Sequence, residues 1–399
     1  MHLLVAGTAL LFTALAASAE PSSELVLPFE PLHNHGSSLV ETPDGGLFVV
    51  WFRGSGERKA DDVAIYGAVR RPRQARWSEP FLVADTPGFP DTNCTLLVDR
   101  EGKLWLLYPT ILANLWETAL MKVKVAEEWG TGPPDWEREF VLHMKPGDDF
   151  PNAVRAKTAD YLAAIGLDEQ SLPDAVRDWR DRNLDLAEDK LTRRLGWFTR
   201  PHPIQLSTGR LLVGLYSDGF SFSMTTFSDD DGATWQMSEP IVGGGNVQPS
   251  LIERADGTVV AYMRDNGPPP KKVLVSESRD GGATWSTVRD HEQLVDSGAG
   301  VDALRLRDGR VLVVHNDVPD GRHRLTVSLS NDEGRTFRTA LRLEDEASKS
   351  GRFSYPSAIE GKDGTIHVTY SVHLPRTEEH PEERKSIRHA WFGAEELER

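Results

Sequence analysis

The chain has 399 residues, 39% of them hydrophobic, which is enough to bury a sizeable core. Its formal net charge of −16 argues against nucleic acids and anionic membrane surfaces as partners, because the long-range field of the protein repels polyanions. The charge does not exclude a single acidic sugar, since arginine side chains in a partly desolvated pocket can bind one carboxylate locally. The single cysteine, Cys94, excludes a disulfide within this sequence, and the composition carries no signal of oligomeric state.

The first 19 residues form an apolar stretch that ends in Ala17, Ser18 and Ala19, the small-residue pattern of a signal peptidase site. We therefore expect residues 1–19 to be a signal peptide and the protein to be secreted or periplasmic. An uncleaved membrane anchor is the alternative, but the segment is short for a membrane span. The mature chain, residues 20–399, is expected to form one domain without contact to a membrane.

Six short β-rich runs recur along the mature chain, and each is opened by an Asp-Gly pair or a close variant. The runs start at Gly45, Gly102, Gly209, Gly257, Gly309 and Gly364, so the steps are 57, 107, 48, 52 and 55 residues. Apart from the doubled second step, this period is typical of one four-stranded propeller blade. The sequence therefore predicts an all-β fold, a six-bladed β-propeller, with one large insertion between blades 2 and 3.

The insertion, residues 145–196, contains few β-branched runs. Its second half, residues 174–195, places apolar side chains at broadly helical intervals with mixed charges between them. We expect a helical insertion that follows a strand on one rim of the propeller. A lid over the central funnel and a brace on the outside are equally compatible with the sequence.

One turn motif, Ser-x-Asp-x-Gly-x-Thr followed by Trp or Phe, occurs three times, at residues 228–235, 278–285 and 330–337. Each residue type has a role in a hairpin turn: Gly adopts positive φ, Asp and Ser or Thr bond back to the turn amides, and the aromatic residue packs underneath. We expect Trp235, Trp285 and Phe337 to be buried anchors that are remote from any site. The motif, an Asp-box, serves folding and carries no chemistry.

The three Asp-boxes, the predicted signal peptide and the placement of several charged residues resemble those of the sialidases (neuraminidases) and the wider group of six-bladed BNR-repeat proteins. The resemblance covers nearly the whole mature chain. It implies a secreted glycoside hydrolase that removes a terminal acidic sugar, sialic acid or a related one, from a glycan. Arginines would bind the sugar carboxylate in bidentate pairs. A tyrosine assisted by a glutamate would replace the carboxylate nucleophile that this charge would repel, and an aspartate would supply the acid.

Several residues of this chain match the positions that the resemblance implies. Arg264 and Arg322 look like the second and third arginines of the family's triad. Tyr355 resembles the nucleophile, although a core aromatic at a strand start is the alternative. Asp61 resembles the acid/base, with Asp62 as its close competitor.

Two positions depart from the family pattern. His35 stands where the first arginine is expected, and Gln248 stands where the glutamate partner of the tyrosine is expected. A buried histidine can bind a carboxylate when protonated or act as a base when neutral. Arg53 is a further candidate for substrate binding.

Neither a metal nor a cofactor is expected. The histidines are scattered over different blades, and although His33 and His35 could be two ligands on one strand, no third ligand can be read from the sequence. No Gly-rich phosphate loop follows a strand and opens a helix, so a nucleotide is not expected.

Three functional hypotheses remain open from the sequence. The first is the sialidase-like hydrolase, with Arg264, Arg322 and His35 at the carboxylate. The second is a lyase acting on a uronic acid, in which His35 or Tyr355 abstracts the proton from C5. The third is a glycan-binding propeller without catalysis, which the loss of the glutamate and the first arginine favours. In each case the partner is a glycan or oligosaccharide.

Overall fold

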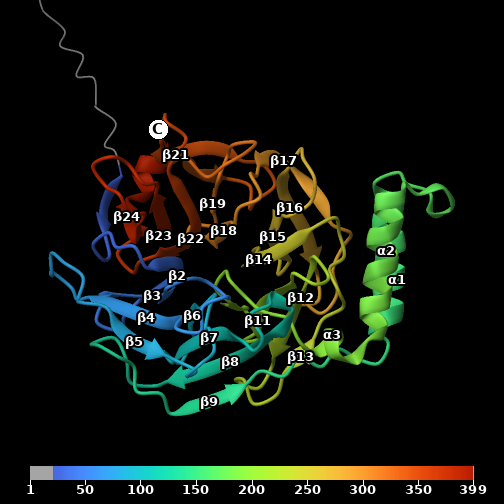
Figure 1. The fold of residues 1–399 in the computed structure, drawn as a ribbon, viewed down its shortest axis with the longest axis horizontal. Helices are drawn as coiled ribbons and strands as arrows, with labels where there is room; N and C mark the ends of the chain where they lie inside the picture. The colour runs from blue at the N-terminus through green and yellow to red at the C-terminus, as the bar shows by residue number, and fades with distance from the viewer. Residues whose placement is uncertain (1–20, 399) are drawn as a thin grey trace, which may run out of the picture.

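The computed structural model describes residues 21–398, which form six four-stranded antiparallel sheets arranged as blades around a central axis (Figure 1). This arrangement confirms the predicted all-β, six-bladed β-propeller. The predicted signal peptide, residues 1–19, lies outside the described residues. Over residues 21–398, no helix is both long and apolar enough to cross a bilayer.

The first three blades each contain four strands in chain order. Blade 1 contains β2 (His33–Glu41), β3 (Leu47–Gly54), β4 (Ala64–Arg70) and β5 (Phe81–Ala84). Blade 2 contains β6 (Thr95–Val98), β7 (Leu104–Ile111), β8 (Ala119–Ala126) and β9 (Arg138–Val141). Blade 3 contains β10 (Ile204–Gln205), β11 (Leu211–Ser217), β12 (Phe222–Ser228) and β13 (Gln236–Met237).

The last three blades repeat this order, except that the outer strand of blade 6 comes from the start of the chain. Blade 4 contains β14 (Asn246–Glu253), β15 (Val259–Asp265), β16 (Lys272–Ser278) and β17 (Arg289–Val295). Blade 5 contains β18 (Asp302–Arg305), β19 (Val311–His315), β20 (Arg324–Ser330) and β21 (Arg338–Asp345). Blade 6 contains β22 (Arg352–Glu360), β23 (Ile366–Leu374), β24 (Arg384–Phe392) and β1 (Ser22–Leu25).

The ring is closed by an antiparallel pair between β1 and β24. Ser22 lies opposite Trp391, and Leu25 lies opposite Arg388. β1 therefore completes the last blade, which joins the first and last strands of residues 21–398 and gives every blade four strands. A short 3-10 helix, η3 (Ala394–Glu398), follows β24.

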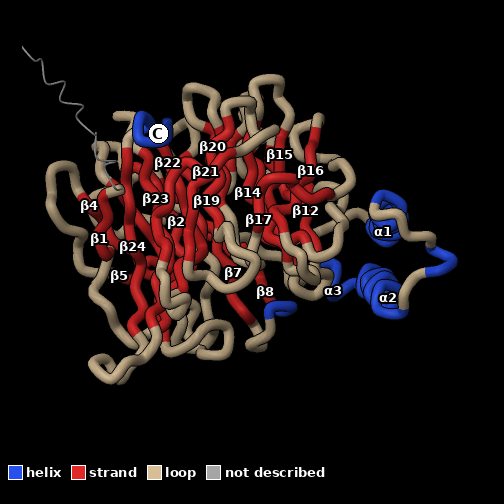
Figure 2. The backbone as a smooth tube through the Cα atoms, turned by 90° about the horizontal axis from the view of Figure 1, so that it is seen from above, coloured by secondary structure: helices blue, strands red, loops and turns tan. Residues whose placement is uncertain are grey.

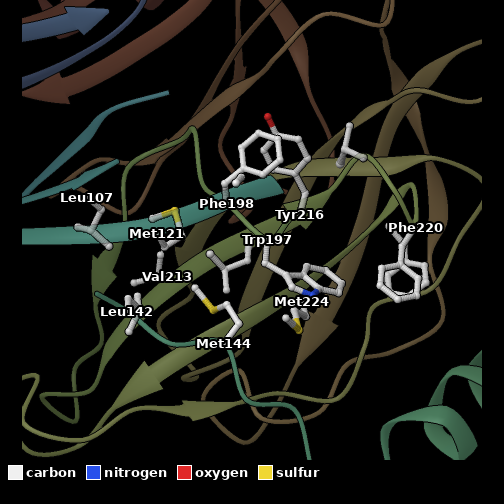
Figure 3. Close-up of a cluster of buried hydrophobic side chains, with 14 of the residues drawn as sticks. Leu107, Met121, Leu142, Met144, Trp197, Phe198, Val213, Tyr216, Phe220 and Met224 are labelled. Atoms are coloured by element: carbon white, nitrogen blue, oxygen red, sulfur yellow. The ribbon is translucent and has the colours of Figure 1, made fainter. Parts of the chain in front are cut away.

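The middle strands are buried on both faces because each blade packs against its neighbours. All eight residues of β7 are buried, which explains why this strand reads as a continuous apolar run instead of an alternating one. A cluster that includes Leu107, Met121 and Val213 fills the space between blades 2 and 3 (Figure 3). The same cluster contains Phe198 and Tyr216, whose ring centroids are 4.3 Å apart. Tyr216 thus connects this core to the end of β11.

The three Asp-box segments form hairpin turns with the same hydrogen bonds. In the first, Ser228 Oγ donates to Asp230 and accepts from the amide of Gly232, whose φ is 77°. Trp285 and Phe337 are buried, as expected, but Trp235 is only half-buried. Trp235 packs edge-on against Trp105 with the ring centroids 6.5 Å apart, while its other side stays open to solvent.

Residues 145–196 contain three helices, α1 (Phe150–Ala164), α2 (Asp174–Glu188) and α3 (Lys190–Arg194), and a 3-10 helix, η2 (Glu169–Ser171). α1 buries Phe150, Val154, Thr158 and Leu162, which repeat every four residues and so form one face of the helix. α1 and α2 form a pair on the outer side of the disc, beside blades 3 and 4 (Figures 1 and 2). Of the two positions that the sequence left open, the insertion takes the outer one.

Candidate active site

Irregular strand starts bring several polar side chains to one face of the disc. The pairing register of β2, β14 and β22 shifts after His35, Val247 and Ser354 respectively. Gln248 and Tyr355, which lie in the last two of these bulges, have φ of 56° and 57°. Each precedes a proline, which has no N–H to donate to the ladder. A bulge re-aims the side chain, and such strained positions are concentrated at functional sites.

A cavity of about 380 Å³ lies where these strand starts meet the ends of neighbouring strands. Most of its lining side chains are polar or charged. They are His33, His35, Glu57, Asn93, Trp116, Tyr216, Asp218, Gln248, Arg264, Asn266, Arg322, Arg352, Tyr355 and His373. Five of the eight residues selected from the sequence are therefore brought together: His35, Gln248, Arg264, Arg322 and Tyr355.

Two arginines converge on Tyr355. Arg264, at the end of β15, donates a hydrogen bond from Nη1 to the phenol oxygen over 3.2 Å. The guanidinium carbon of Arg322 lies 5.3 Å from the centroid of the phenol ring. Burial raises the pKa of Tyr355, but the positive charges of Arg264 and Arg322 outweigh burial and bring the pKa below its ordinary value of 10.0. The phenolate form of Tyr355 is therefore favoured relative to a free tyrosine.

Gln248 lies between two phenols. Its Nε2 lies 3.4 Å from the oxygen of Tyr355 and 3.1 Å from the oxygen of Tyr216. Asn93, with φ of 41°, donates a further hydrogen bond to Tyr216 over 2.9 Å. Burial raises the pKa of Tyr216 well above its usual range, so this second phenol stays neutral. Gln248 acts as a hydrogen-bond donor to Tyr355 and has no carboxylate to take its proton.

His35 lies in the cavity as a neutral ring. Burial, together with the fields of His373, His33 and Arg322, holds the pKa of His35 well below its ordinary value. Its Nδ1 is 2.8 Å from Ser371 Oγ, and its ring packs edge-on against Tyr355 with the centroids 4.3 Å apart. At neutral pH, His35 therefore supplies no positive charge in place of the missing arginine.

Two further histidines, His33 and His373, lie next to His35, and a third arginine lines the same cavity. The ring centroids of His33 and His373 lie 5.3 Å and 5.2 Å from that of His35. Burial lowers the pKa of His33 to about 3 and that of His373 to about 4, so all three rings are neutral at pH 7. Arg352, the first residue of β22, lines the same cavity. Across residues 21–398, no three or more His, Cys, Asp or Glu side chains are grouped so as to hold a metal ion.

The two aspartates proposed as the acid do not line the cavity. Asp61 accepts a hydrogen bond from Asn114 Nδ2 over 2.8 Å, and Asp62 accepts one from the amide of Ser55 over 3.1 Å. Both carboxylates are exposed and stabilise the loop between β3 and β4. The loop folds so that these two side chains point to its own backbone and to the neighbouring blade, and not to the funnel.

Arg53 is also outside the cavity. It forms a bidentate ion pair with Glu30, with nitrogen to oxygen distances of 2.6 Å and 2.8 Å, and its guanidinium carbon lies 5.0 Å from the ring centroid of Tyr66. This arrangement uses Arg53 to join β3 to the segment before β2. A substrate carboxylate would have to displace Glu30 to reach it.

Two carboxyl groups that the sequence analysis did not select line the cavity instead. Glu57 comes from the same β3–β4 loop as Asp61, four residues earlier, and Asp218 follows the end of β11. Burial raises the pKa of both groups, although nearby arginines oppose it. A carboxyl group with a raised pKa keeps its proton to higher pH, which suits a general acid. The charged loop of residues 53–62 was the available signal for Glu57, but sequence alone does not say which of its acids points inward.

Arg200 supports Tyr355 from behind the cavity wall. It is buried, donates from Nη1 to the carbonyl of Pro356 over 2.9 Å and bonds from Nη2 to the carbonyl of Val301. Its guanidinium carbon lies 5.3 Å from the ring centroid of Tyr355. Arg200 therefore holds the strained turn at Tyr355 in place.

Comparisons with known families and proteins identify the family and the fold of this chain. The model of a family described as a BNR repeat-like domain matches residues 45–160 and 165–368, most of the chain. An anhydrosialidase from Macrobdella decora is 27% identical over 186 residues, which are 42% of this chain and 24% of that protein. The matched segment thus spans about a quarter of the leech protein.

Solved structures with the same fold include a protein of unknown function, a sialidase and an intramolecular trans-sialidase. A Dyadobacter fermentans protein of unknown function superposes with a TM-score of 0.65 at 16% identity, covering 94% of this chain and 98% of that one. A Streptococcus pneumoniae sialidase gives a TM-score of 0.65 at 14% identity, covering 94% of this chain and 71% of that one. A leech intramolecular trans-sialidase bound to 2,7-anhydro-Neu5Ac gives 0.66 at 14% identity, with 98% and 73% covered. At these identities the likeness establishes the fold.

Proposed function

We propose that this chain, which belongs to the BNR repeat-like domain family, is a glycoside hydrolase that removes a terminal acidic sugar from a glycan. The observation that carries the proposal is the hydrogen bond from Arg264 to the phenol oxygen of Tyr355 inside the polar cavity. It places an activated oxygen nucleophile beside groups that attract an anion. The sialidase names of the leech relative and of the pneumococcal structure support the same reaction class.

The three arginines of the cavity select the substrate. Arg264, Arg322 and Arg352 come from blades 4, 5 and 6 and line the same cavity, so a carboxylate can be bound by guanidinium groups from several directions. The local charge is positive even though the whole chain carries −16. A terminal sugar with a carboxylate beside its anomeric carbon, such as sialic acid, fits this arrangement.

Tyr355 is the nucleophile of the proposed reaction. A phenol avoids the repulsion that an aspartate or glutamate would meet from the substrate carboxylate. In place of a glutamate base, two cations and the amide of Gln248 stabilise the phenolate. Because the pKa of Tyr355 lies below its ordinary value, the phenol gives up its proton to solvent more readily than a free tyrosine does, and the phenolate is the form that reacts.

Glu57 is the acid/base of the proposed reaction. In the first step, the phenolate oxygen of Tyr355 attacks the anomeric carbon, the bond to the glycosidic oxygen breaks, and Glu57 gives its proton to the leaving oxygen. In the second step, Glu57 takes a proton from water, whose oxygen attacks the anomeric carbon and releases the phenolate. The raised pKa of Glu57 keeps the proton available for the first step.

A uronate lyase is the second candidate, and one observation favours it. His35 is neutral and packs against Tyr355, so an uncharged imidazole and a phenol of lowered pKa stand side by side in a cavity lined by three arginines. Such a pair can remove the proton from C5 of a uronate whose carboxylate the arginines neutralise, while the bond from C4 to the glycosidic oxygen breaks and Glu57 gives its proton to that oxygen. The lyase leaves a conjugated double bond in its product, whereas the hydrolase does not.

The experiment that tests the proposal incubates the purified protein with sialylated and uronate-containing glycans. Released sugar is measured by chromatography, and absorbance in the near ultraviolet is recorded in parallel. Free acidic monosaccharide without new absorbance, lost in Tyr355→Phe, supports the hydrolase. New absorbance with a glycan fragment supports the lyase. Binding of these glycans without any product contradicts both candidates and leaves a glycan-binding propeller.

We place this activity outside the cytoplasm on the strength of the apolar segment with Ala17, Ser18 and Ala19 at its end. The test is expression of the whole sequence in a bacterial host, followed by mass spectrometry of the exported protein. An exported chain that begins at Glu20 is expected. A chain that keeps residues 1–19 and stays with the cells contradicts this placement.

A further inference from the structure

A second cavity of about 410 Å³, open to solvent, lies between the helical insertion and the propeller. Tyr161 of α1 and Trp179 of α2 line it from the insertion, and Ser221, Gly244, Asn266 and Gly267 line it from the propeller. The volume lies within the usual range for small-molecule sites. This cavity lies outside the site described above and has no role in the steps assigned to Tyr355 and Glu57.

The second cavity adjoins the candidate active site. Asn266 lines both cavities, and the loop between β11 and β12 gives Asp218 to the first cavity and Ser221 to the second. Arg264 connects them, because it bonds to Tyr355 through Nη1 and to Asn266 Oδ1 through Nη2 over 3.3 Å. A glycan whose terminal sugar sits beside Tyr355 can therefore extend past Asn266 into the second cavity.

The insertion is anchored so that the second cavity is preformed. The face of α1 that carries Phe150 and Val154 joins the core between blades 2 and 3. Lys157 forms an ion pair with Glu239 over 3.0 Å and donates to the carbonyl of Trp285 over 3.1 Å. A Cβ atom at Gly244 would lie 2.5 Å from the hydroxyl of Tyr161, so only glycine allows α1 to approach this closely.

The chemistry of the lining differs from that of the first cavity. No Asp, Glu, Lys or Arg is among the described residues that line it, whereas three arginines line the first cavity. Trp179 is half-buried, and its ring stands 6.1 Å from that of Tyr161 at an interplanar angle of 62°. The remaining lining is apolar and comes from Leu162, Ile165, Ala175, Val176 and Pro268. The half-buried indole of Trp179 can pack against the apolar face of a pyranose ring, while the Ser221 hydroxyl and the Asn266 amide bond the ring hydroxyls. The lining thus matches a neutral sugar and not an acidic one.

We propose that this cavity is a subsite for the neutral sugars on the leaving-group side of the glycan, with one pyranose ring packed on Trp179. The inference rests on the proposed function, because the first cavity must hold the terminal acidic sugar of the same molecule. It gives the insertion a role in substrate selection: an acidic sugar attached to a neutral oligosaccharide is preferred to an acidic sugar on a small leaving group.

The test compares Trp179→Ala with wild type on two substrates that share one terminal acidic sugar. One is a trisaccharide with two neutral sugars, and the other carries a small aryl leaving group. We expect KM for the trisaccharide to rise about tenfold while kcat/KM for the aryl glycoside stays within about twofold. Trp179→Phe, which keeps an aromatic ring, should have a KM for the trisaccharide close to that of wild type. Asp178→Ala, on an exposed neighbour in α2 that does not line the cavity, is the matched control and should leave both substrates unchanged. Equal losses on the two substrates, or none on the trisaccharide, overturn the subsite.

A second variant and a binding measurement distinguish loss of sugar binding at the subsite from loss of protein stability and from loss of the chemical step. Ile165→Arg places a bulky charge on an exposed residue that lines the cavity, and it should raise KM for the trisaccharide in the same way. Calorimetry with Tyr355→Phe protein and the neutral disaccharide alone should show weak binding that Trp179→Ala abolishes. Binding of the disaccharide without hydrolysis of any acidic glycan contradicts the proposed function but leaves a sugar-binding site in this cavity. Hydrolysis of the acidic glycan without disaccharide binding that depends on Trp179 contradicts the subsite alone.

Discussion

The phenol oxygen of Tyr355 accepts a hydrogen bond from Nη1 of Arg264, with the two atoms 3.2 Å apart. The two residues are 91 positions apart in the chain and come from blades 4 and 6. Their contact lowers the pKa of Tyr355, because a fixed cation at hydrogen-bond distance favours the phenolate. The chemistry proposed for this protein depends on that contact.

Arg264→Gln should therefore raise the pKa of Tyr355. The sign follows from the charges: a cation stabilises the phenolate, so its removal makes proton loss occur at higher pH. The measurement is an ultraviolet titration of phenolate, with Tyr355→Phe used to identify the signal. Arg352 lines the same cavity without bonding to the phenol, so Arg352→Gln serves as the control. We expect it to shift the pKa of Tyr355 less than Arg264→Gln does. An unchanged titration in Arg264→Gln would remove the basis for an activated phenol.

Gln248→Glu should also raise the pKa of Tyr355. The amide donates to the phenol oxygen, whereas a carboxylate at that position accepts a proton and repels the phenolate. The pH at which kcat/KM reaches half of its maximum on the acidic side should move upward. A pH profile that coincides with that of wild type would show that Gln248 does not act on the phenol.

Glu57→Gln should lower kcat for glycans with sugar leaving groups by about 10²- to 10⁴-fold, because these poor leaving groups need a proton. Aryl glycosides with good leaving groups should be affected much less. The raised pKa of Glu57 also predicts that the fall in wild-type activity on the alkaline side disappears in this variant. Asp61→Asn, in the same loop but outside the cavity, is the control and should keep nearly full activity. If Asp61→Asn loses more activity than Glu57→Gln, the assignment of the acid is wrong.

Trp285→Ala should destabilise the fold by about 3–5 kcal/mol, since it leaves a cavity under an Asp-box turn. Trp235→Ala, at the equivalent but half-buried position, should cost less than about 2 kcal/mol. Chemical unfolding of both variants measures the difference, and the remaining folded protein should keep its kcat. A loss of activity in Trp285→Ala without a loss of stability would contradict the structural role.

The blades could be counted from the sequence because the features that mark them are local. The glycine of each Asp-Gly-type turn has φ between 82° and 97°, a conformation that few other residues adopt, and the six are Gly45, Gly102, Gly209, Gly257, Gly309 and Gly364. The position of the insertion on the outer side was not predictable. It depends on which surface the apolar face of α1 meets after folding, and the helical period carries no information about that surface.

The candidate site was only partly predictable for a similar reason. Tyr355 and Gln248 were identified because they match positions that the resemblance to the sialidases implies, and both lie near the start of an inner strand. Glu57 was missed because the choice between it and Asp61 depends on Asn114, a residue in another blade that binds the Asp61 carboxylate. His35 was identified, but its neutral state follows from its burial and from His373 and Arg322, which come from other blades.

The most direct test of the account is the kcat of Tyr355→Phe on a glycan that the wild-type protein cleaves. The substitution removes one hydroxyl, and the rest of the side chain keeps its packing against His35, so the fold should remain intact by circular dichroism and thermal unfolding. We predict that kcat falls by several orders of magnitude, because the chemical step has lost its nucleophile. A Tyr355→Phe protein that retains more than about a tenth of the wild-type kcat would contradict the central claim.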